Sequence, residues 1–256
     1  MWRGPTVAGQ KEASAKAKGK IYGIHSKLIA IAAESGADPD INHTLADALA
    51  DARKAGVTTD VIERAIKRWA GLDKDAKKVE EVLYEWYLPG WVAVIVRALT
   101  DNRNRTAPSV RHIFSANGGN LWETGSVSSY LFDFIGQITL PLPSDMEAFE
   151  MIILETPAQD YREEGWKMMI TTERTHLAEV KQILIKNGFI PEKSELTYIP
   201  KNYIEVTNFE QALQIYMFLG ECEEDEDIEI TWNNAEINDD LWKQVQEKVE
   251  AKRFRT

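Results

Sequence analysis

Residues 136–155 read GQITLPLPSDMEAFEMIILE, and within this stretch a strand pattern gives way to a helix pattern. We predict a strand over residues 136–140 and a helix over residues 144–155. Further along the chain, the same reasoning predicts strands near 160–164 and 166–171, a helix over 175–187 and a strand over 189–198. The order βαββαβ is that of the ferredoxin-like split unit, so residues 135–202 are predicted to form one α/β domain.

Strands and helices are also predicted on both sides of this domain. Before it, residues 79–87 and 91–100 are rich in Val, Ile, Tyr and Trp and are joined by a Pro89-Gly90 turn, which predicts a hairpin. A helix then runs to about Ser115, and a strand is expected over 127–134. After it come a helix over 208–220, an acidic connection over 221–227, a strand over 228–232 and a final helix from Asp239.

The strand over 228–232 has no obvious partner nearby in the sequence. We expect it to complete the sheet that begins at Val79, which makes residues 135–202 an insertion. The middle α/β domain is then 79–134 plus 203–256.

The first 78 residues are predicted to form a separate helical domain. Apolar residues at helical spacing start near Lys16, and breaks at 35–40 and at Ala55-Gly56 divide the segment into three helices. The exposed side of the third helix carries Arg64, Lys67 and Arg68. The expected fold class is therefore α+β: an N-terminal three-helix domain followed by two ferredoxin-like α/β domains, the third inserted in the second.

Composition places the chain among ordinary globular proteins. Its 256 residues are 44% hydrophobic and 28% charged, and no run approaches the ~18 apolar residues that cross a bilayer. A single cysteine, Cys222, excludes a disulfide framework and a cysteine-based zinc site, so we expect a reducing, cytoplasmic setting and no membrane partner.

Charge is unevenly distributed along the chain. Residues 1–79 hold 14 Lys/Arg and 10 Asp/Glu, whereas residues 80–256 hold 16 and 31. The acidic total argues against indiscriminate coating of DNA, but a basic N-terminal arm is compatible with polyanion binding through one face. The alternative is that these lysines are only a solvated terminus.

Signs of catalysis are nearly absent. The four histidines form no HxxxH or HxH pair, so no metal site is expected, and neither a Walker loop nor a GxGxxG motif after a strand is present. Cys222 lies among acidic residues, which raise a thiol pKa rather than lower it. The acidic run 221–227 is most simply a solvated loop, although a divalent-ion site is an alternative. We expect no enzyme activity, no cofactor and no small-molecule substrate.

The segment DNRNRT, residues 101–106, opens the helix that follows the hairpin. Its Asn residues are cap formers, and Arg103, Arg105 and, further on, Arg111 are candidates for binding phosphates with the N–H groups of the helix start. The alternative is an Arg/Asn network that ties domains together through carboxylates such as Glu85 or Glu123. The Gly118-Gly119 pair that follows is better interpreted as a helix stop than as a phosphate cradle.

Several strings together resemble the YebC family, whose mitochondrial relative is the translational activator of cytochrome c oxidase subunit I. They run from about Lys16 to about Glu247, and the most specific are DNRNRT and NGGNL. The others are KGKIY (18–22), residues 42–50, VIERAIKR (61–68) and TGSV (124–127).

The resemblance implies a helical domain followed by two α/β domains, and no enzymatic activity. Many bacterial members are named probable transcriptional regulators that bind DNA, whereas functional work points to the ribosome and to elongation through difficult sequences such as proline runs. Carried over by motif, the nucleic-acid-facing positions are Lys16, Lys18, Lys20, Lys27, Arg64, Lys67, Arg68, Arg103, Arg105 and Arg111.

The chain departs from the family pattern in two respects. The family often opens with His-Ser-Lys-Trp and further basic residues, whereas Trp2-Arg3-Gly4-Pro5 stands here, which weakens the case for nucleic-acid contact by the extreme N-terminus. Trp69, Trp86, Trp91 and Trp122 occupy places where the family usually has glycine. Our hypothesis is that the source organism reads UGA as glycine, whereas the printed sequence has tryptophan at these codons.

Two main functions follow from these expectations. The preferred one is a translation factor that binds the ribosome, with rRNA or tRNA as the polyanion, because neither a base-reading helix nor an aromatic stacking platform is evident. The alternative is a DNA-binding transcriptional regulator, and a protein-binding adaptor is a weaker third. Nucleic-acid binding of either kind would weaken steeply with salt.

Overall fold

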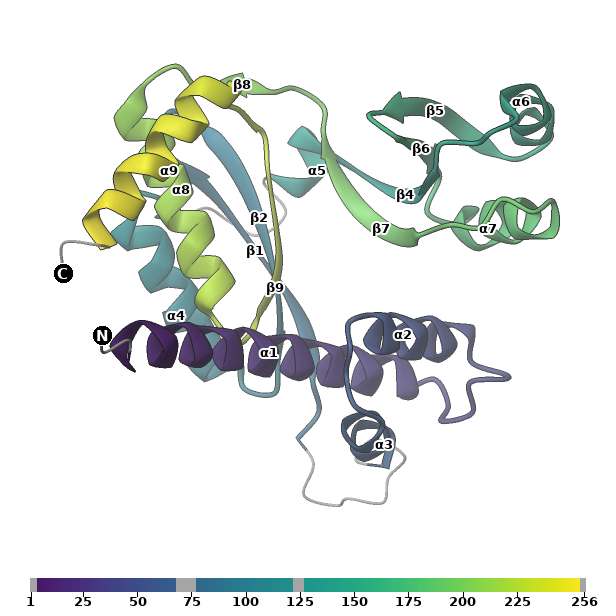
Figure 1. The fold of residues 1–256 in the computed structure, drawn as a ribbon, viewed down its shortest axis with the longest axis horizontal. Helices are drawn as coiled ribbons and strands as arrows, with labels where there is room; N and C mark the ends of the chain where they lie inside the picture. The colour runs from purple at the N-terminus through teal and green to yellow at the C-terminus, as the bar shows by residue number, and fades with distance from the viewer. Residues whose placement is uncertain (1–3, 68–76, 122–126, 254–256) are drawn as a thin grey trace. The chain divides into compact units, whose positions relative to one another are not determined.

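The computed structural model describes residues 4–67, 77–121 and 127–253, and side chains within 17–67, 77–119 and 127–251 (Figure 1). Its contacts divide into two compact units. Unit 1 comprises residues 1–124, 205–231 and 235–256, and unit 2 comprises residues 125–204 and 232–234. The helical segment and the first sheet therefore share one compact unit.

Unit 1 contains a four-stranded sheet of order β3-β1-β2-β9. Strands β1 (Glu80–Leu88) and β2 (Val92–Thr100) form an antiparallel hairpin, with Glu80 opposite Thr100 and Leu88 opposite Val92. Strand β3 (Asn120–Leu121) pairs with β1, and β9 (Ile228–Asn233) lies beside β2. The prediction that the late strand completes the sheet begun by the hairpin is confirmed.

Helices α4 (Arg103–Ala116) and α8 (Phe209–Glu224) pack together on one face of this sheet. Phe114 of α4 stacks on Trp86 of β1 with ring centroids 4.3 Å apart, and lies 4.6 Å from Phe218 of α8. Helix α9 (Asp239–Arg253) follows α8 and contacts it through Tyr216 and Trp242. Burial of these aromatic rings provides a large apolar contribution to the core of unit 1.

The N-terminal helices are α1 (Gly4–Ala33), α2 (His43–Lys54) and α3 (Thr59–Lys67). Their own core includes Ile29, Leu45, Leu49 and Ile62. Helix α1 begins at Gly4, well before Lys16, the predicted start, and Pro5 lies in its first turn, where proline is tolerated. Leu28 and Ala30 of α1 also pack with Val79 and Leu99, so this helix joins the three-helix core to the sheet.

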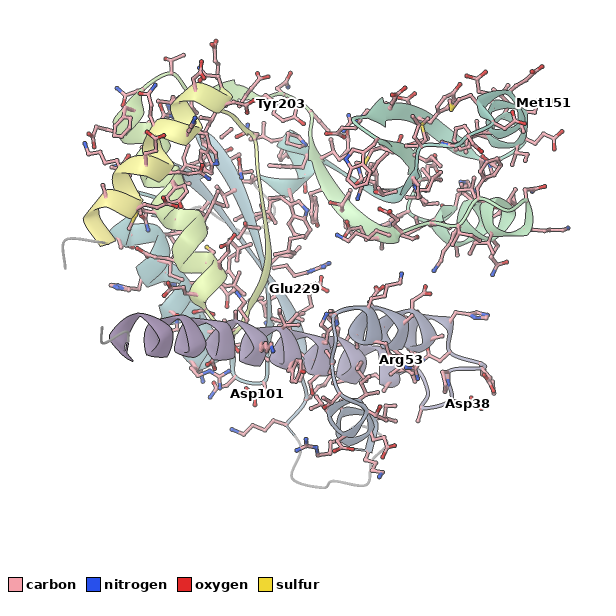
Figure 2. The ribbon with its side chains drawn as sticks, in the orientation of Figure 1. Asp38, Arg53, Asp101, Met151, Tyr203 and Glu229 are labelled. Atoms are coloured by element: carbon pink, nitrogen blue, oxygen red, sulfur yellow. The ribbon has the colours of Figure 1, made fainter. Side chains whose placement is uncertain are left out.

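Unit 2 has the predicted βαββαβ order, with a four-stranded sheet of order β5-β6-β4-β7. The elements are β4 (Phe132–Pro141), α6 (Met146–Leu154), β5 (Ala158–Glu164), β6 (Lys167–Thr172), α7 (Leu177–Lys186) and β7 (Lys193–Pro200). Phe149 of α6 and Leu184 of α7 pack on Ile138, Leu140 and Ile170 of the sheet. Met151 is on the outer side of α6, 67% exposed (Figure 2).

The strand predicted over 136–140 is present, but its separation from the one predicted over 127–134 is wrong. The chain forms a short helix, α5 (Ser128–Leu131), and then one continuous strand, β4, instead of separate strands over 127–134 and 136–140. Gly136 suggests a break in the sequence, but in β4 it is a packing position, since a Cβ there would lie 2.6 Å from Thr172 Oγ1 and 3.0 Å from Leu177 Cβ.

Two smaller features complete the fold. Helix α8 continues to Glu224, through half of the predicted acidic connection. Strands β8 (Ile204–Glu205) and β10 (Ala235–Glu236) form a two-stranded sheet.

Of the four tryptophans suspected to replace glycine, two lie in the described residues. Trp91 has φ +65° and is the only non-glycine residue described with a positive φ; it follows Gly90, with φ +80°, in the hairpin turn. Trp86 is 2% exposed, and its Nε1–H has no acceptor among the described residues. The backbone favours glycine at 91, whereas the ring at 86 fills the core. Trp69 and Trp122 lie outside the described residues.

Candidate nucleic-acid interface

The start of α4, where DNRNRT lies, is capped by its own asparagine. The Asn102 side chain accepts from the N–H groups of Asn104 and Arg105 at 3.1 and 3.3 Å, and the Asn102 N–H donates to Thr100 Oγ1. The cap predicted from sequence is therefore present. It also occupies two of the N–H groups that a phosphate at this helix start would need.

Asp227, at the junction of α8 and β9, binds the side chains of three residues from α1 and α4. Its carboxylate accepts from Lys27 Nζ at 2.7 Å, from Arg105 Nη2 at 2.9 Å and from Thr106 Oγ1 at 2.7 Å. Burial acts to raise the pKa of Asp227, but the hydrogen bonds from Lys27, Thr106 and Arg105 outweigh it, so this pKa lies below its ordinary value. The junction is an internal charged network that ties α1, α4 and β9 together.

Lys20 caps the end of α8. Its Nζ donates to the carbonyl oxygens of Cys222 at 3.1 Å and Glu223 at 2.9 Å, groups that the helix itself leaves unbonded. Burial lowers the pKa of Lys20, and burial raises the pKa of Cys222 to about 12. Cys222 is thus a poorly ionising, buried thiol, as its acidic surroundings predict.

The remaining arginines of α4 are more exposed. Arg103 pairs with Glu80 of β1, with 63% of its side chain exposed, and Arg105 also contacts Asp101 at 3.2 Å. Arg111 is exposed and makes no ion pair with another described residue. The carboxylates that hold Arg103 and Arg105 are therefore Glu80, Asp101 and Asp227. The network alternative named Glu85, which is buried in β1, and Glu123, which lies outside the described residues.

Besides Lys18 of α1, exposed cations of the helical segment lie on α2 and α3. On α3, Arg64 and Lys67 are exposed; Arg64 donates to the carbonyl of Asp60, and Lys67 forms a solvent-exposed pair with Glu63 at 3.5 Å. On α2, the last turn carries Arg53 and Lys54, both exposed (Figure 2). Sequence analysis missed these two, although basic residues in a last turn are the ones that the helix dipole favours.

The ten predicted positions thus fall into three groups. Lys18, Arg64, Lys67, Arg103 and Arg111 are exposed. Lys20, Lys27 and Arg105 bind acceptors in residues 222–227, although 55% of the Arg105 side chain is exposed. The side chains of Lys16 and Arg68 lie outside the described residues. Exposed ion pairs contribute little and exchange readily with other ions, so the first group is the one available to phosphate.

Two other candidate sites have structural explanations. Gly118 has φ +76° and the Gly119 N–H donates to the carbonyl of Phe114 at 2.8 Å, which is the hydrogen bond of a helix stop.

A cavity of 590 Å³ is lined by Lys27, Asp101, Arg105 and residues 224–227. Among the described residues, no group of three or more His, Cys, Asp or Glu is placed to hold a metal ion. Nor does any described helix have the length and apolarity to span a membrane.

Comparisons with known proteins cover nearly all of the chain. Residues 4–72 match the family model of the TACO1/YebC protein N-terminal domain, and residues 79–235 match that of the TACO1/YebC second and third domain. A probable transcriptional regulatory protein of Kosmotoga olearia is 37% identical over 247 residues, covering 95% of this chain and 96% of that protein. A probable transcriptional regulatory protein of Acidithiobacillus ferrooxidans is 38% identical over 236 residues, covering 92% of this chain and 93% of that protein.

The fold is also similar to a solved structure. A crystal structure of a conserved hypothetical protein, Aq1575, from Aquifex aeolicus matches with a TM-score of 0.76 at 38% identity, covering 86% of this chain and 91% of that one.

Proposed function

This chain belongs to the TACO1/YebC family, and from that membership we propose that it regulates gene expression, without catalysis, by binding a nucleic acid through exposed cations of its N-terminal helices. The bacterial relatives named above carry the name probable transcriptional regulatory protein, and the family is one of regulators rather than of enzymes.

The observation that carries the proposal is where the unburied cations lie. Residues 1–79 have an excess of four positive charges, and α2 and α3 present Arg53, Arg64 and Lys67 to solvent in a protein whose net charge is −11. In contrast, Lys27 and Arg105 share the carboxylate of Asp227, and Arg105 also pairs with Asp101. Phosphate contacts need local cationic surface, which favours the helices over the start of α4.

We favour RNA as the ligand, with the protein acting on the ribosome as a translation factor that assists elongation through difficult sequences. On the exposed side of α3, Lys67 pairs with Glu63 one turn away, so few cations are free of a neighbouring carboxylate. So few cations suit contacts to the phosphates and to the shape of an RNA helix more than the reading of base edges. The relatives' names support the second candidate, a DNA-binding transcriptional regulator.

Sedimentation in a sucrose gradient tests the proposal. We expect the protein to migrate with ribosomes at low salt, and the variant Arg64→Ala/Lys67→Ala to shift to the top. The matched control is Arg162→Ala/Lys186→Ala in unit 2, which removes the same charge, including one exposed cation paired at 3.4 Å with Glu164.

Three results decide between the readings. Loss of co-migration in the α3 variant alone supports ribosome binding by the helices. An equal loss of co-migration in the control variant means that the effect comes from the total charge of the protein and not from α3. Sedimentation at the top, together with specific binding to promoter DNA, supports the transcriptional regulator instead.

A further inference from the structure

Unit 2 carries a cluster of aromatic rings where β4 and β7 pair beyond the helix-covered part of the sheet. Phe134 of β4 and Tyr198 of β7 are directly opposite each other, and their rings stack with centroids 4.6 Å apart and an interplanar angle of 28°. Further along the same face, a Cβ at Gly136 would touch Leu177, the first residue of α7, so the helix cover ends close to this pair.

The other rings of the cluster contact one another edge to face. Tyr198 also meets Phe132 and Trp232 edge to face, at 6.4 and 5.0 Å, and Trp232 Nε1–H donates to Thr197 Oγ1 at 2.9 Å. Trp232 is 8% exposed, whereas Phe134 is 36% exposed. Because Tyr198 covers one face of the Phe134 ring, a base can stack only on the opposite face.

We propose that Phe134, supported by Tyr198, is a stacking platform for an unpaired nucleobase of RNA; this rests on the nucleic-acid function proposed above. A flat ring already ordered by a parallel neighbour loses little conformational freedom when a base stacks on it. Every base has a π-face, so the contact is tolerant of sequence and needs no hydrogen-bond readout.

The surrounding charges favour the base over the phosphate as the point of contact. Unit 2 contains 12 Asp/Glu and 7 Lys/Arg, which disfavours a tract of phosphates. One cation stands beside the platform: Lys201, directly after β7, pairs with Asp133 of β4 at 3.4 Å, and both side chains are partly exposed. Such an exposed pair is weak enough to yield to a single phosphate.

The test is binding of oligouridine, oligoadenosine and a blunt RNA duplex over a range of salt to wild type, Phe134→Leu and Trp166→Leu. Leu keeps an apolar side chain but removes the ring. Trp166 is the matched control, because it is 77% exposed and its carbonyl accepts from Leu142 just beyond the far end of β4. Circular dichroism confirms that each variant is folded.

We expect Phe134→Leu to weaken single-strand binding about fivefold or more, with no effect on the duplex. Because stacking releases no counterions, the slope of log affinity against log salt stays unchanged. In contrast, Arg64→Ala/Lys67→Ala is expected to lower that slope.

The two proposals fail in distinguishable ways. Three outcomes overturn the platform but not the proposed binding by Arg64 and Lys67. They are a Phe134→Leu variant that binds single strands as tightly as wild type, an equal loss of its affinity for the duplex, and an equal loss of single-strand affinity in Trp166→Leu. Intact RNA binding with loss of a protein partner in Phe134→Leu makes this face a protein-docking site and also overturns it. Absence of any nucleic-acid binding by wild type overturns the proposed function itself.

Discussion

The turn between β1 and β2 offers a sharp test of how backbone conformation limits residue choice. Trp91 has φ +65°, a left-handed conformation that costs a residue with a Cβ roughly 1–2 kcal/mol. Replacing Trp91 with glycine removes this cost. It also removes an edge-to-face contact with Tyr87 at 5.9 Å, which contributes about 0.5 kcal/mol at a side chain that is 69% exposed.

A comparison of two variants isolates the backbone effect. Trp91→Ala and Trp91→Gly both lose the Tyr87 contact, but only glycine relieves the left-handed strain. Glycine is also more flexible in the unfolded chain, which costs about 0.4–1 kcal/mol relative to alanine. The net expectation is that Trp91→Gly is more stable than Trp91→Ala by about 1 kcal/mol. Urea unfolding followed by circular dichroism measures the difference.

Trp166 provides the control, since it also follows a glycine in a hairpin turn but does not have a positive φ. There, Trp166→Gly is expected to be less stable than Trp166→Ala by about 0.4–1 kcal/mol. If alanine and glycine rank in the same order at both positions, the argument from φ at residue 91 is refuted.

Four further outcomes follow from the structure. The intact mass of protein purified from its natural source tests whether some of its tryptophans are glycine in nature, and a mass that fits all eight tryptophans excludes the UGA hypothesis. Asp227→Ala leaves Lys27 largely buried without its partner and is expected to destabilise unit 1 by about 3 kcal/mol in urea unfolding, whereas the exposed Glu163→Ala serves as the near-neutral control. Since the folded pKa of Asp227 lies below the ordinary 3.8, its contribution to stability is present above that pH and is lost as pH falls through the folded pKa; an acid titration in which wild type and Asp227→Ala lose stability in parallel contradicts this. Cys222, with its pKa raised to about 12 by burial, is expected to resist thiol reagents at neutral pH until urea unfolds the protein, and rapid labelling of the native state contradicts the buried assignment.

Much of the architecture could be predicted from the sequence because its signals are local. Alternating residues in β6 and helical spacing in α6 and α7 gave the order of elements in unit 2, and the isolated strand at Ile228 required a distant partner. Element boundaries were less predictable: β4 runs through Gly136, which packs closely against Thr172 and Leu177, and α1 begins at Gly4, well before Lys16.

The charged site was harder to predict, because its partners are remote in sequence. Arg105 and Asp227 are 122 positions apart, and Lys27 is 200 positions from Asp227. Read locally, residues 221–227 are a solvated acidic run and 103–111 a basic one. Only the fold shows that Asp227, at the end of one run, pairs with Arg105 of the other, whereas Arg64 and Lys67 of α3 stay exposed.

The insertion of unit 2 affects the order in which the chain can fold as it is synthesised. Nearly all of unit 2 is one continuous segment, 125–204, so its sheet can close once that segment has left the ribosome. The sheet of unit 1 is completed later, because β2 pairs with β9, and Arg97 of β2 binds Glu229 of β9, which is 132 positions further along the chain. Until β9 emerges, β2 presents an open, apolar edge of the kind that recruits other strands, and the carboxylate that secures Lys27 and Arg105 has not yet been made. Translation of Asp227 and of β9, the last strand of this sheet, therefore completes both the sheet and its charged junction.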